Sequence, residues 1–140
     1  MSKVAVVYWS GTGNTEMMAN AVADGAKTKG AEVEVFTPAA FDSAKMDLYD
    51  AVAFGCPAMG AEVLEESEFQ PMFDECAAKL SGKKIALFGS WGWGGGEWMR
   101  NWEAQCRDLG AVLACDSVTC ANQPEEDTLG ACMNLGAALA

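Results

Sequence analysis

The first run of residues that could do chemistry combines hydroxyls with glycines: Ser10, Gly11, Thr12, Gly13, Asn14 and Thr15. Hydroxyls and the opening NH groups of a helix can bind a phosphate through neutral donors. The run lacks the third glycine of the dinucleotide fingerprint, because Glu16 stands there, and it contains no P-loop lysine. This weakens an NAD or ATP site. The alternative is an ordinary strand-to-helix turn with a capping Asn or Thr.

A second run is dense in glycines and indoles: Ser90, Trp91, Gly92, Trp93, Gly94, Gly95, Gly96, Glu97 and Trp98. Indole rings that faced only water would be unfavourable, so a flat ligand is expected to cover one of them. Trp91 and Trp93 are the candidates for stacking on that ligand. Trp98 and Trp102 lie four residues apart at the start of a helix, and we expect them to pack in the core.

A third run lies between these two: Cys56, Pro57, Ala58, Met59, Gly60, Ala61 and Glu62. Met59 offers a polarizable thioether to an aromatic face, Gly60 offers backbone freedom, and Glu62 offers a hydrogen-bond acceptor. The alternative interpretation of this run is a solvated turn.

Missing residue types narrow the chemistry. The chain has no histidine, which excludes Ser-His-Asp and Cys-His catalysis and zinc sites that use imidazole. Its six cysteines include no CxxC pair and match neither a zinc nor an iron–sulfur spacing. We therefore predict reduced, mostly buried thiols and no metal site.

The hydrophobic pattern predicts the elements that would position these runs. Apolar or alternating segments predict strands at residues 4–8, 31–36, 51–55, 84–89 and 111–115, the last with an extension towards residue 120 left open. Helical spacing predicts helices from residue 14 to a stop at Gly30, over 66–80, from about 98 to 109, and over 125–139. Alternating strands and helices indicate an α/β fold, a doubly wound five-stranded parallel sheet with helices on both faces. Ligands then bind at the carboxyl ends of the strands, which all three runs follow.

Length and charge limit the remaining possibilities. A chain of 140 residues, 51% of them hydrophobic, is expected to form one domain over residues 1–140. The net charge of -11 argues against nucleic acid and anionic membranes as partners and favours a basic one. The apolar runs are too short to span a bilayer, and no export signal opens the chain, so a cytoplasmic location is expected.

The three runs resemble the flavin mononucleotide (FMN) loops of flavodoxins, and the likeness extends over the whole chain. It is strongest to the short-chain, clostridial type. The resemblance implies a sheet order of 2-1-3-4-5, non-covalently bound FMN, and a monomeric low-potential carrier that shuttles between semiquinone and hydroquinone states. It implies no enzyme activity of the protein's own.

The resemblance also assigns roles to residues. The phosphate would be held by Ser10, Thr12, Asn14 and Thr15. Met59 and Trp93 would flank the isoalloxazine ring, and Glu62 would bond its pyrimidine edge. Asn122 would lie in the last segment near the flavin.

Gly60 is implied to carry a backbone carbonyl that swings to accept the proton at flavin N5. A Cβ would strain one of the two conformers by about 1 kcal/mol or more. We expect Gly60→Ala to lower the potential of the first reduction step in a redox titration. An unchanged potential would reject this role.

Negative charge is expected to act in two ways. A phosphate dianion in an acidic protein disfavours the anionic reduced flavin, which predicts a strong reductant. We also expect Glu62, Glu65, Glu66 and Glu68 to orient basic redox partner proteins, such as reductases.

Three other functions stay open at this point. The first is a flavin-dependent reductase of quinones, although no additional loop is evident to hold a second substrate. The second is a phosphoacceptor receiver domain, which would need an acidic cluster and a lysine at the strand ends. The third is thiol–disulfide exchange, which the absence of CxxC disfavours.

Overall fold

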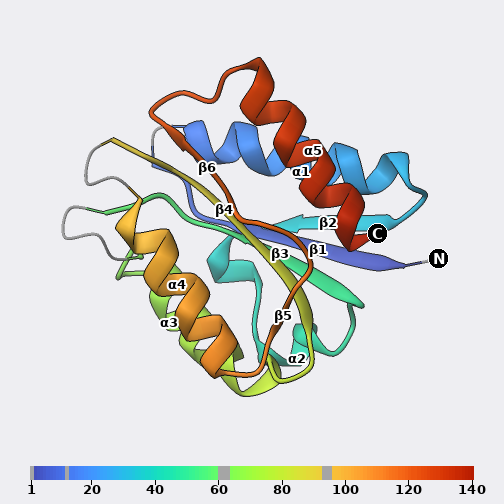
Figure 1. Cartoon of the computed structure of the whole chain (residues 1–140). Coiled ribbons are helices and arrows are strands. Elements are labelled where there is room, and N and C mark those ends of the chain that lie inside the picture. Colours follow the sequence, from blue (N-terminus) through green and yellow to red (C-terminus); the bar gives the residue numbers. More distant parts are fainter. Residues whose placement is uncertain (1, 12, 60–63, 93–95) are drawn as a thin grey trace.

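One parallel β-sheet runs through the computed structural model, which describes residues 2–11, 13–59, 64–92 and 96–140. Its strands are β1 (Lys3–Tyr8), β2 (Glu32–Phe36), β3 (Ala51–Gly55), β4 (Lys84–Trp91), β5 (Val112–Leu113) and β6 (Val118–Ala121). The order is β2-β1-β3-β4-β5, and β6 also pairs with β4 (Figure 1). The predicted α/β class and the strand order 2-1-3-4-5 are confirmed.

The central strands are buried on both faces, as their unbroken apolar sequences predict. All of β3 is buried, as is β1 from Val4 to Val7. At the edge, Glu32 and Glu34 of β2 are exposed and Val33 is half-buried, but Val35 is 43% exposed, so the alternation is incomplete. Val4 pairs with Val33 of β2 and with Ala51 of β3, which fixes the register in the middle of the sheet.

The fifth position of the sheet is divided between two strands. Val112 and Leu113 pair with Lys84 and Ile85 near the start of β4, whereas β6 pairs with the segment from Phe88 to Trp91. The prediction of one strand over 111–115 is therefore wrong in its extent, and the extension towards residue 120 forms a separate strand. This second strand carries the chain to the carboxyl edge of the sheet.

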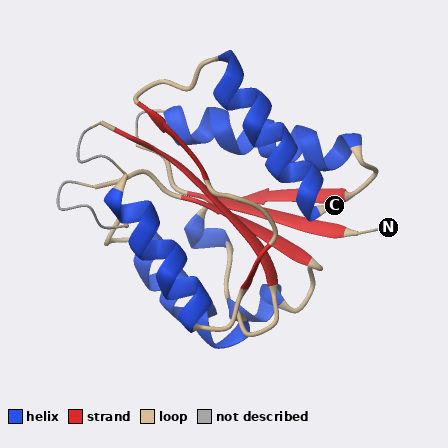
Figure 2. Cartoon of the chain, in the orientation of Figure 1, coloured by secondary structure: helices blue, strands red, loops and turns tan. Residues whose placement is uncertain are grey.

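Helices cover both faces of the sheet (Figure 2). On one face lie α1 (Asn14–Thr28) and α5 (Glu126–Leu139); on the other lie α2 (Ser43–Met46), α3 (Phe69–Cys76) and α4 (Glu97–Asp108) (Figure 1). Short 3-10 turns span Pro38–Ala40 and Ala77–Lys79. The predicted helix over 66–80 is shorter and ends in such a turn. Within the described ranges, no helix combines the length and apolar character needed to cross a membrane.

The two helices on the first face touch through their backbones. A Cβ built on Gly25 of α1 would lie 1.9 Å from the carbonyl oxygen of Met133. One built on Gly136 of α5 would lie 1.9 Å from that of Val22. Real Cβ atoms do not approach this closely, so the absence of a side chain at both positions sets the spacing between α1 and α5.

All six cysteines are free, and four are buried: Cys56, Cys76, Cys106 and Cys132. Burial raises the pKa of each of these four thiols to about 12. The prediction that most of the thiols are buried is confirmed. Cys115 and Cys120 are half-buried, and burial raises the pKa of these thiols too.

The difference in burial between these two groups of cysteines predicts the order in which their thiols are modified. Because the thiolate is the reactive form and must also be reached by the reagent, iodoacetamide at pH 8 should modify Cys115 and Cys120 first. Timed labelling of the folded protein followed by peptide mass spectrometry measures this order. Modification of Cys56 or Cys106 at the same rate would contradict the buried packing.

Candidate functional site

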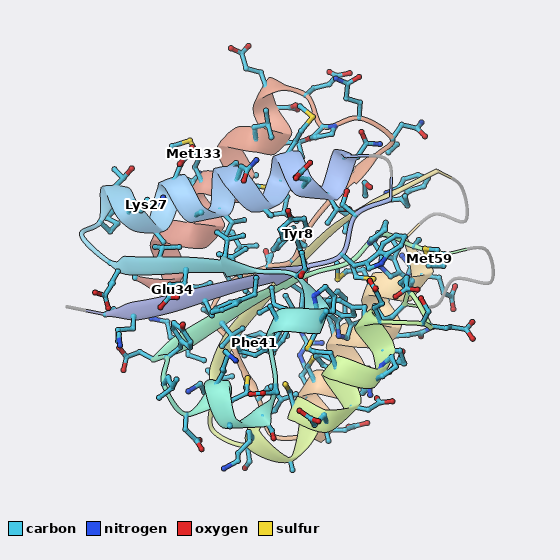
Figure 3. The ribbon with its side chains drawn as sticks, turned by 180° about the vertical axis from the view of Figure 1, so that it is seen from behind. Tyr8, Lys27, Glu34, Phe41, Met59 and Met133 are labelled. Carbon is cyan, nitrogen blue, oxygen red and sulfur yellow. The ribbon has the colours of Figure 1, made fainter. Side chains whose placement is uncertain are left out.

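A cavity of about 270 Å³ lies at the carboxyl edge of the sheet, where the chain leaves β1, β3, β4 and β6. The described residues that line it are Trp9, Gly11, Asn14, Pro57, Ala58, Met59, Ser90, Trp91, Gly92 and Asn122. Figure 3 shows Met59 at this edge, at the opposite side of the molecule from Lys27 and Glu34. The three runs singled out in the sequence thus converge on one cavity.

Two buried hydroxyls join the first run to β4. Thr15 Oγ1 lies 3.3 Å from Ser90 Oγ, although 75 positions separate the residues in sequence. Thr15 is 1% exposed and Ser90 is 5% exposed. A hydroxyl can both donate and accept, so one hydrogen bond joins this pair. The remaining donor and acceptor sites can bind a ligand without adding charge.

Ser10 shapes the turn that opens α1. Its Oγ accepts hydrogen bonds from the amides of Gly13 at 3.1 Å and Glu16 at 3.3 Å. Gly13 is the N-cap residue, and its φ of 95° is one that glycine adopts readily. The cap is therefore made by Ser10 rather than by Asn14 or a threonine. The Ser10 hydroxyl keeps its own hydrogen to donate.

Cys56 precedes the segment that carries Met59, and its hydrogen bonds anchor the chain before and after that segment. Its carbonyl oxygen accepts a hydrogen bond from Trp98 Nε1 at 3.2 Å, and its Sγ accepts one from the amide of Glu65 at 3.3 Å. On the cavity side, the amide of Ala58 donates to the carbonyl of Ser90 at 3.0 Å. These contacts fasten the second and third runs to each other.

The Glu65 carboxylate begins α3. It accepts hydrogen bonds from the amides of Ser67, Glu68 and Phe69 at 2.8 to 2.9 Å, and from the Ser67 hydroxyl. Burial alone would raise the pKa of Glu65, but these hydrogen bonds outweigh it and lower the pKa to about 2. Glu65 is 6% exposed. The expectation that Glu65 orients a partner is therefore wrong, because its carboxylate is used inside the protein.

The cavity wall beside β4 is formed by Trp91, Gly92 and Asn122. The Asn122 amide donates to the Trp91 carbonyl at 2.6 Å, and Asn122 has a φ of 61°. Among the described residues, a Cβ on Gly92 would come within 4 Å of Asn122 Oδ1 alone, at 3.7 Å. Trp98 and Trp102 are each 2% exposed, which confirms that they pack in the core.

The described site residues fall into two groups. Those in the cavity wall are Gly11, Asn14, Pro57, Ala58, Met59, Ser90, Trp91, Gly92 and Asn122. Ser10, Gly13 and Thr15 lie outside that wall and stabilise the turn between β1 and α1. Five predicted residues lie outside the described part of the chain: Thr12, Gly60, Glu62, Trp93 and Gly94.

Sequence reasoning missed Trp9. This half-buried residue follows β1 directly, packs against the hydrophobic core and lines the cavity. A Cβ on Gly11 would lie 3.0 Å from its indole ring, so the backbone of the first run rests against Trp9. The available signal was its position, the last apolar residue before Ser10 at a strand's carboxyl end.

The family model for flavodoxins matches residues 6–136. The chain belongs to the flavodoxin family. It is 46% identical to a Clostridium beijerinckii flavodoxin over 121 residues, covering 86% of this chain and 88% of that one. It is 44% identical to a Megasphaera elsdenii flavodoxin over 140 residues, covering 98% of both. The solution structure of the two-electron reduced M. elsdenii flavodoxin superposes with a TM-score of 0.89 at 43% identity, covering 97% of each chain.

Membership of the flavodoxin family identifies the cofactor and the activity of the protein. Flavodoxins bind FMN and carry electrons, cycling between the semiquinone and hydroquinone states, and they are not enzymes with a substrate of their own. This short-chain flavodoxin is thus an FMN-binding one-electron carrier.

Proposed function

We propose that the cavity binds FMN with its phosphate at residues 10–15 and its ring at Met59. The convergence of neutral donors and apolar side chains on this cavity supports the orientation. Asn14 stands in the first turn of α1, where backbone amides lack partners within the helix. Met59 and Trp91 bring a thioether and an indole to the other end.

The remaining assignments are proposals from the same orientation. Ser10, Thr12 and Thr15 hold the phosphate with Asn14, while Gly11 and Gly13 let the backbone approach it. Trp93 covers the ring face opposite Met59, Gly60 carries the carbonyl that responds to reduction, and Glu62 bonds the pyrimidine edge. The remaining contacts come from Pro57, Ala58, Ser90, Gly92, Gly94 and Asn122.

The lack of positive charge among the described residues of the cavity wall supports a low reduction potential for bound FMN. Bound FMN supplies reversible one-electron transfer. None of the described residues in the cavity wall is charged. Arg100, the cation nearest in sequence to the run at residues 90–98, lines a neighbouring hollow that shares Trp91 with the cavity, and its Nη2 lies 3.6 Å from Glu97 Oε2. Negative charge on the ring would therefore gain little compensation from these side chains.

The proposed partners are basic redox proteins. Glu66 and Glu68 are exposed beside the Met59 segment and keep the docking role that Glu65 does not have. The net charge of -11 gives a long-range attraction to a basic surface. We further propose that residues 1–140 act as one FMN-binding domain, as a monomer, in the cytoplasm.

Partner docking predicts salt-dependent electron transfer. Reduction of cytochrome c, a lysine-rich haem protein, by the reduced flavodoxin should slow about tenfold or more as ionic strength rises from about 0.01 M to 0.5 M. Stopped-flow absorbance measures the second-order rate constant. A neutral quinone acceptor serves as the control, and its rate should stay nearly constant. Equal salt dependence for both acceptors would reject steering.

A further inference from the structure

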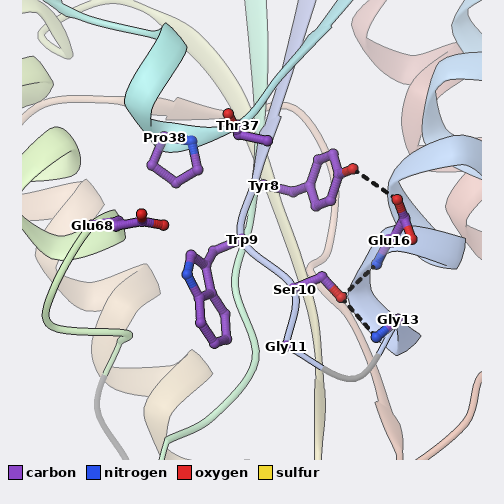
Figure 4. Close-up of a pocket in the computed structure, with 9 residues that line it drawn as sticks. All are labelled: Tyr8, Trp9, Ser10, Gly11, Gly13, Glu16, Thr37, Pro38 and Glu68. Atoms are coloured by element: carbon purple, nitrogen blue, oxygen red, sulfur yellow. Dashed lines mark hydrogen bonds between the residues drawn. The ribbon is translucent and has the colours of Figure 1, made fainter.

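A second hollow, of about 380 Å³, lies beside the FMN cavity, with Trp9 between them. Its lining, as far as the described part of the chain goes, consists of Tyr8, Trp9, Ser10, Gly11, Gly13, Glu16, Thr37, Pro38 and Glu68. Figure 4 shows the Trp9 indole with Glu68 on one side of it and Tyr8, Ser10 and Glu16 on the other. The FMN proposal uses Ser10, Gly11 and Gly13 but leaves the two carboxylates and the Trp9 ring unexplained.

Tyr8 holds the Glu16 carboxylate in place, and the backbone of Glu68 is fixed by the helix cap. Tyr8 donates its hydroxyl to Glu16 Oε2 at 3.2 Å, and burial together with the Glu16 charge raises the pKa of Tyr8, so this donor stays protonated. Glu68 stands at the start of α3, where its amide donates to Glu65 Oε1 at 2.8 Å. The nine described lining residues include no lysine or arginine. The described lining of the hollow therefore carries two carboxylates and an indole, with no cation to pair with them.

We infer that this hollow receives an arginine side chain of the redox partner. The inference rests on the proposed function, in which basic proteins dock near the cofactor. A guanidinium group is planar, stacks on an indole and has five N–H donors, so a guanidinium stacked on Trp9 can also donate to a carboxylate beside the ring. Tryptophan gives the strongest cation–π contact among aromatic side chains. Lysine would satisfy the charge but not the stacking.

Trp9 gives this contact a consequence for electron transfer. The same indole lines the hollow and the FMN cavity, and it packs against the hydrophobic core. An arginine seated on it is therefore fixed next to the cofactor rather than elsewhere on the acidic surface. The hollow thus sets which part of the partner faces the flavin.

The test is a titration of the FMN-loaded, 15N-labelled protein with N-acetyl-L-argininamide, followed by NMR. The indole Nε1–H signal of Trp9, assigned by its loss in Trp9→Phe, should shift and saturate. The double variant Glu16→Gln/Glu68→Gln should weaken this binding about fivefold or more. A matched control, Asp24→Asn/Asp108→Asn, removes the same charge from exposed positions outside the hollow and should bind as the wild type does. N-acetyl-L-lysinamide should bind more weakly than the arginine probe.

Two results would overturn the inference. The first is a Trp9 signal that does not move with the arginine probe. The second is equal weakening by the two double variants, which would indicate general attraction to an acidic protein. Failure of the partner proposal is separately visible, because it removes the salt dependence of the wild-type reaction with cytochrome c, whereas the Trp9 titration involves no partner protein.

Discussion

Glu65→Gln is expected to lower the free energy of unfolding by about 2 to 3 kcal/mol at pH 7. The carboxylate is nearly buried and accepts hydrogen bonds from three consecutive amides and one hydroxyl at the start of α3. Glutamine keeps the shape, but it has one acceptor oxygen and turns an NH2 group towards donors. Urea unfolding at a fixed FMN concentration, followed by far-ultraviolet circular dichroism, measures the loss.

The lowered pKa gives this effect a definite pH dependence. A folded-state pKa of about 2 lies below the ordinary glutamate value of about 4.3, so ionised Glu65 stabilises the folded protein above that ordinary value. Its contribution is lost as the pH falls from about 4.3 towards 2. The stability difference between wild type and Glu65→Gln should therefore shrink between pH 5 and pH 3.

Glu66→Gln is the matched control. It makes the same chemical change at the next residue, which is exposed. Its unfolding free energy should stay within about 0.5 kcal/mol of the wild type. If Glu65→Gln and Glu66→Gln behave alike, or if the Glu65→Gln difference is the same at pH 3 as at pH 7, the buried cap is refuted.

Gly25→Ala is expected to lower the free energy of unfolding by about 2 kcal/mol or more. The added methyl group would overlap the Met133 carbonyl, and because that obstacle is backbone, α1 and α5 must separate. Separation also loosens the buried contacts around Cys132 and Leu135. Thermal unfolding of the FMN-loaded protein should show a midpoint lower by several degrees.

Gly130→Ala separates packing from helix propensity. Gly130 is an exposed residue of α5, and a Cβ there would meet no atom of the described residues within 4 Å. Alanine favours the helix by about 1 kcal/mol over glycine, so Gly130→Ala should stabilise the protein. Stabilisation by Gly25→Ala as well would show that the two helices are not in backbone contact.

The sequence predicted element boundaries best for strands that are buried on both faces. The apolar run at residues 51–55 coincides with β3, and the prediction for β1 differs by a single residue at its start. The start of α3 was less accurate, because a side-chain cap from Glu65 determines it and hydrophobic spacing does not register caps. The short α2 was missed because its four residues are too few to show a helical period.

The site was predictable as a meeting place of loops but not as a set of contacts. Parallel strands end at one edge, so the three runs had to converge there. The pairing of Thr15 with Ser90 joins residues 75 positions apart, and no local pattern indicates such a contact. The acidic residues at 62–68 were also predicted to act together as one docking surface. The fold buries Glu65 and leaves Glu66 and Glu68 exposed.

Titration of the apoprotein with riboflavin 5'-phosphate, followed by flavin fluorescence, tests the central claim most directly. We expect quenching that ends at one flavin per chain, because the ring becomes covered by Met59 and an indole. Riboflavin, which lacks the phosphate, should bind about 100-fold or more weakly, because it forgoes the donors at residues 10–15. Unquenched fluorescence, or equal affinity for the two flavins, would contradict the proposed site.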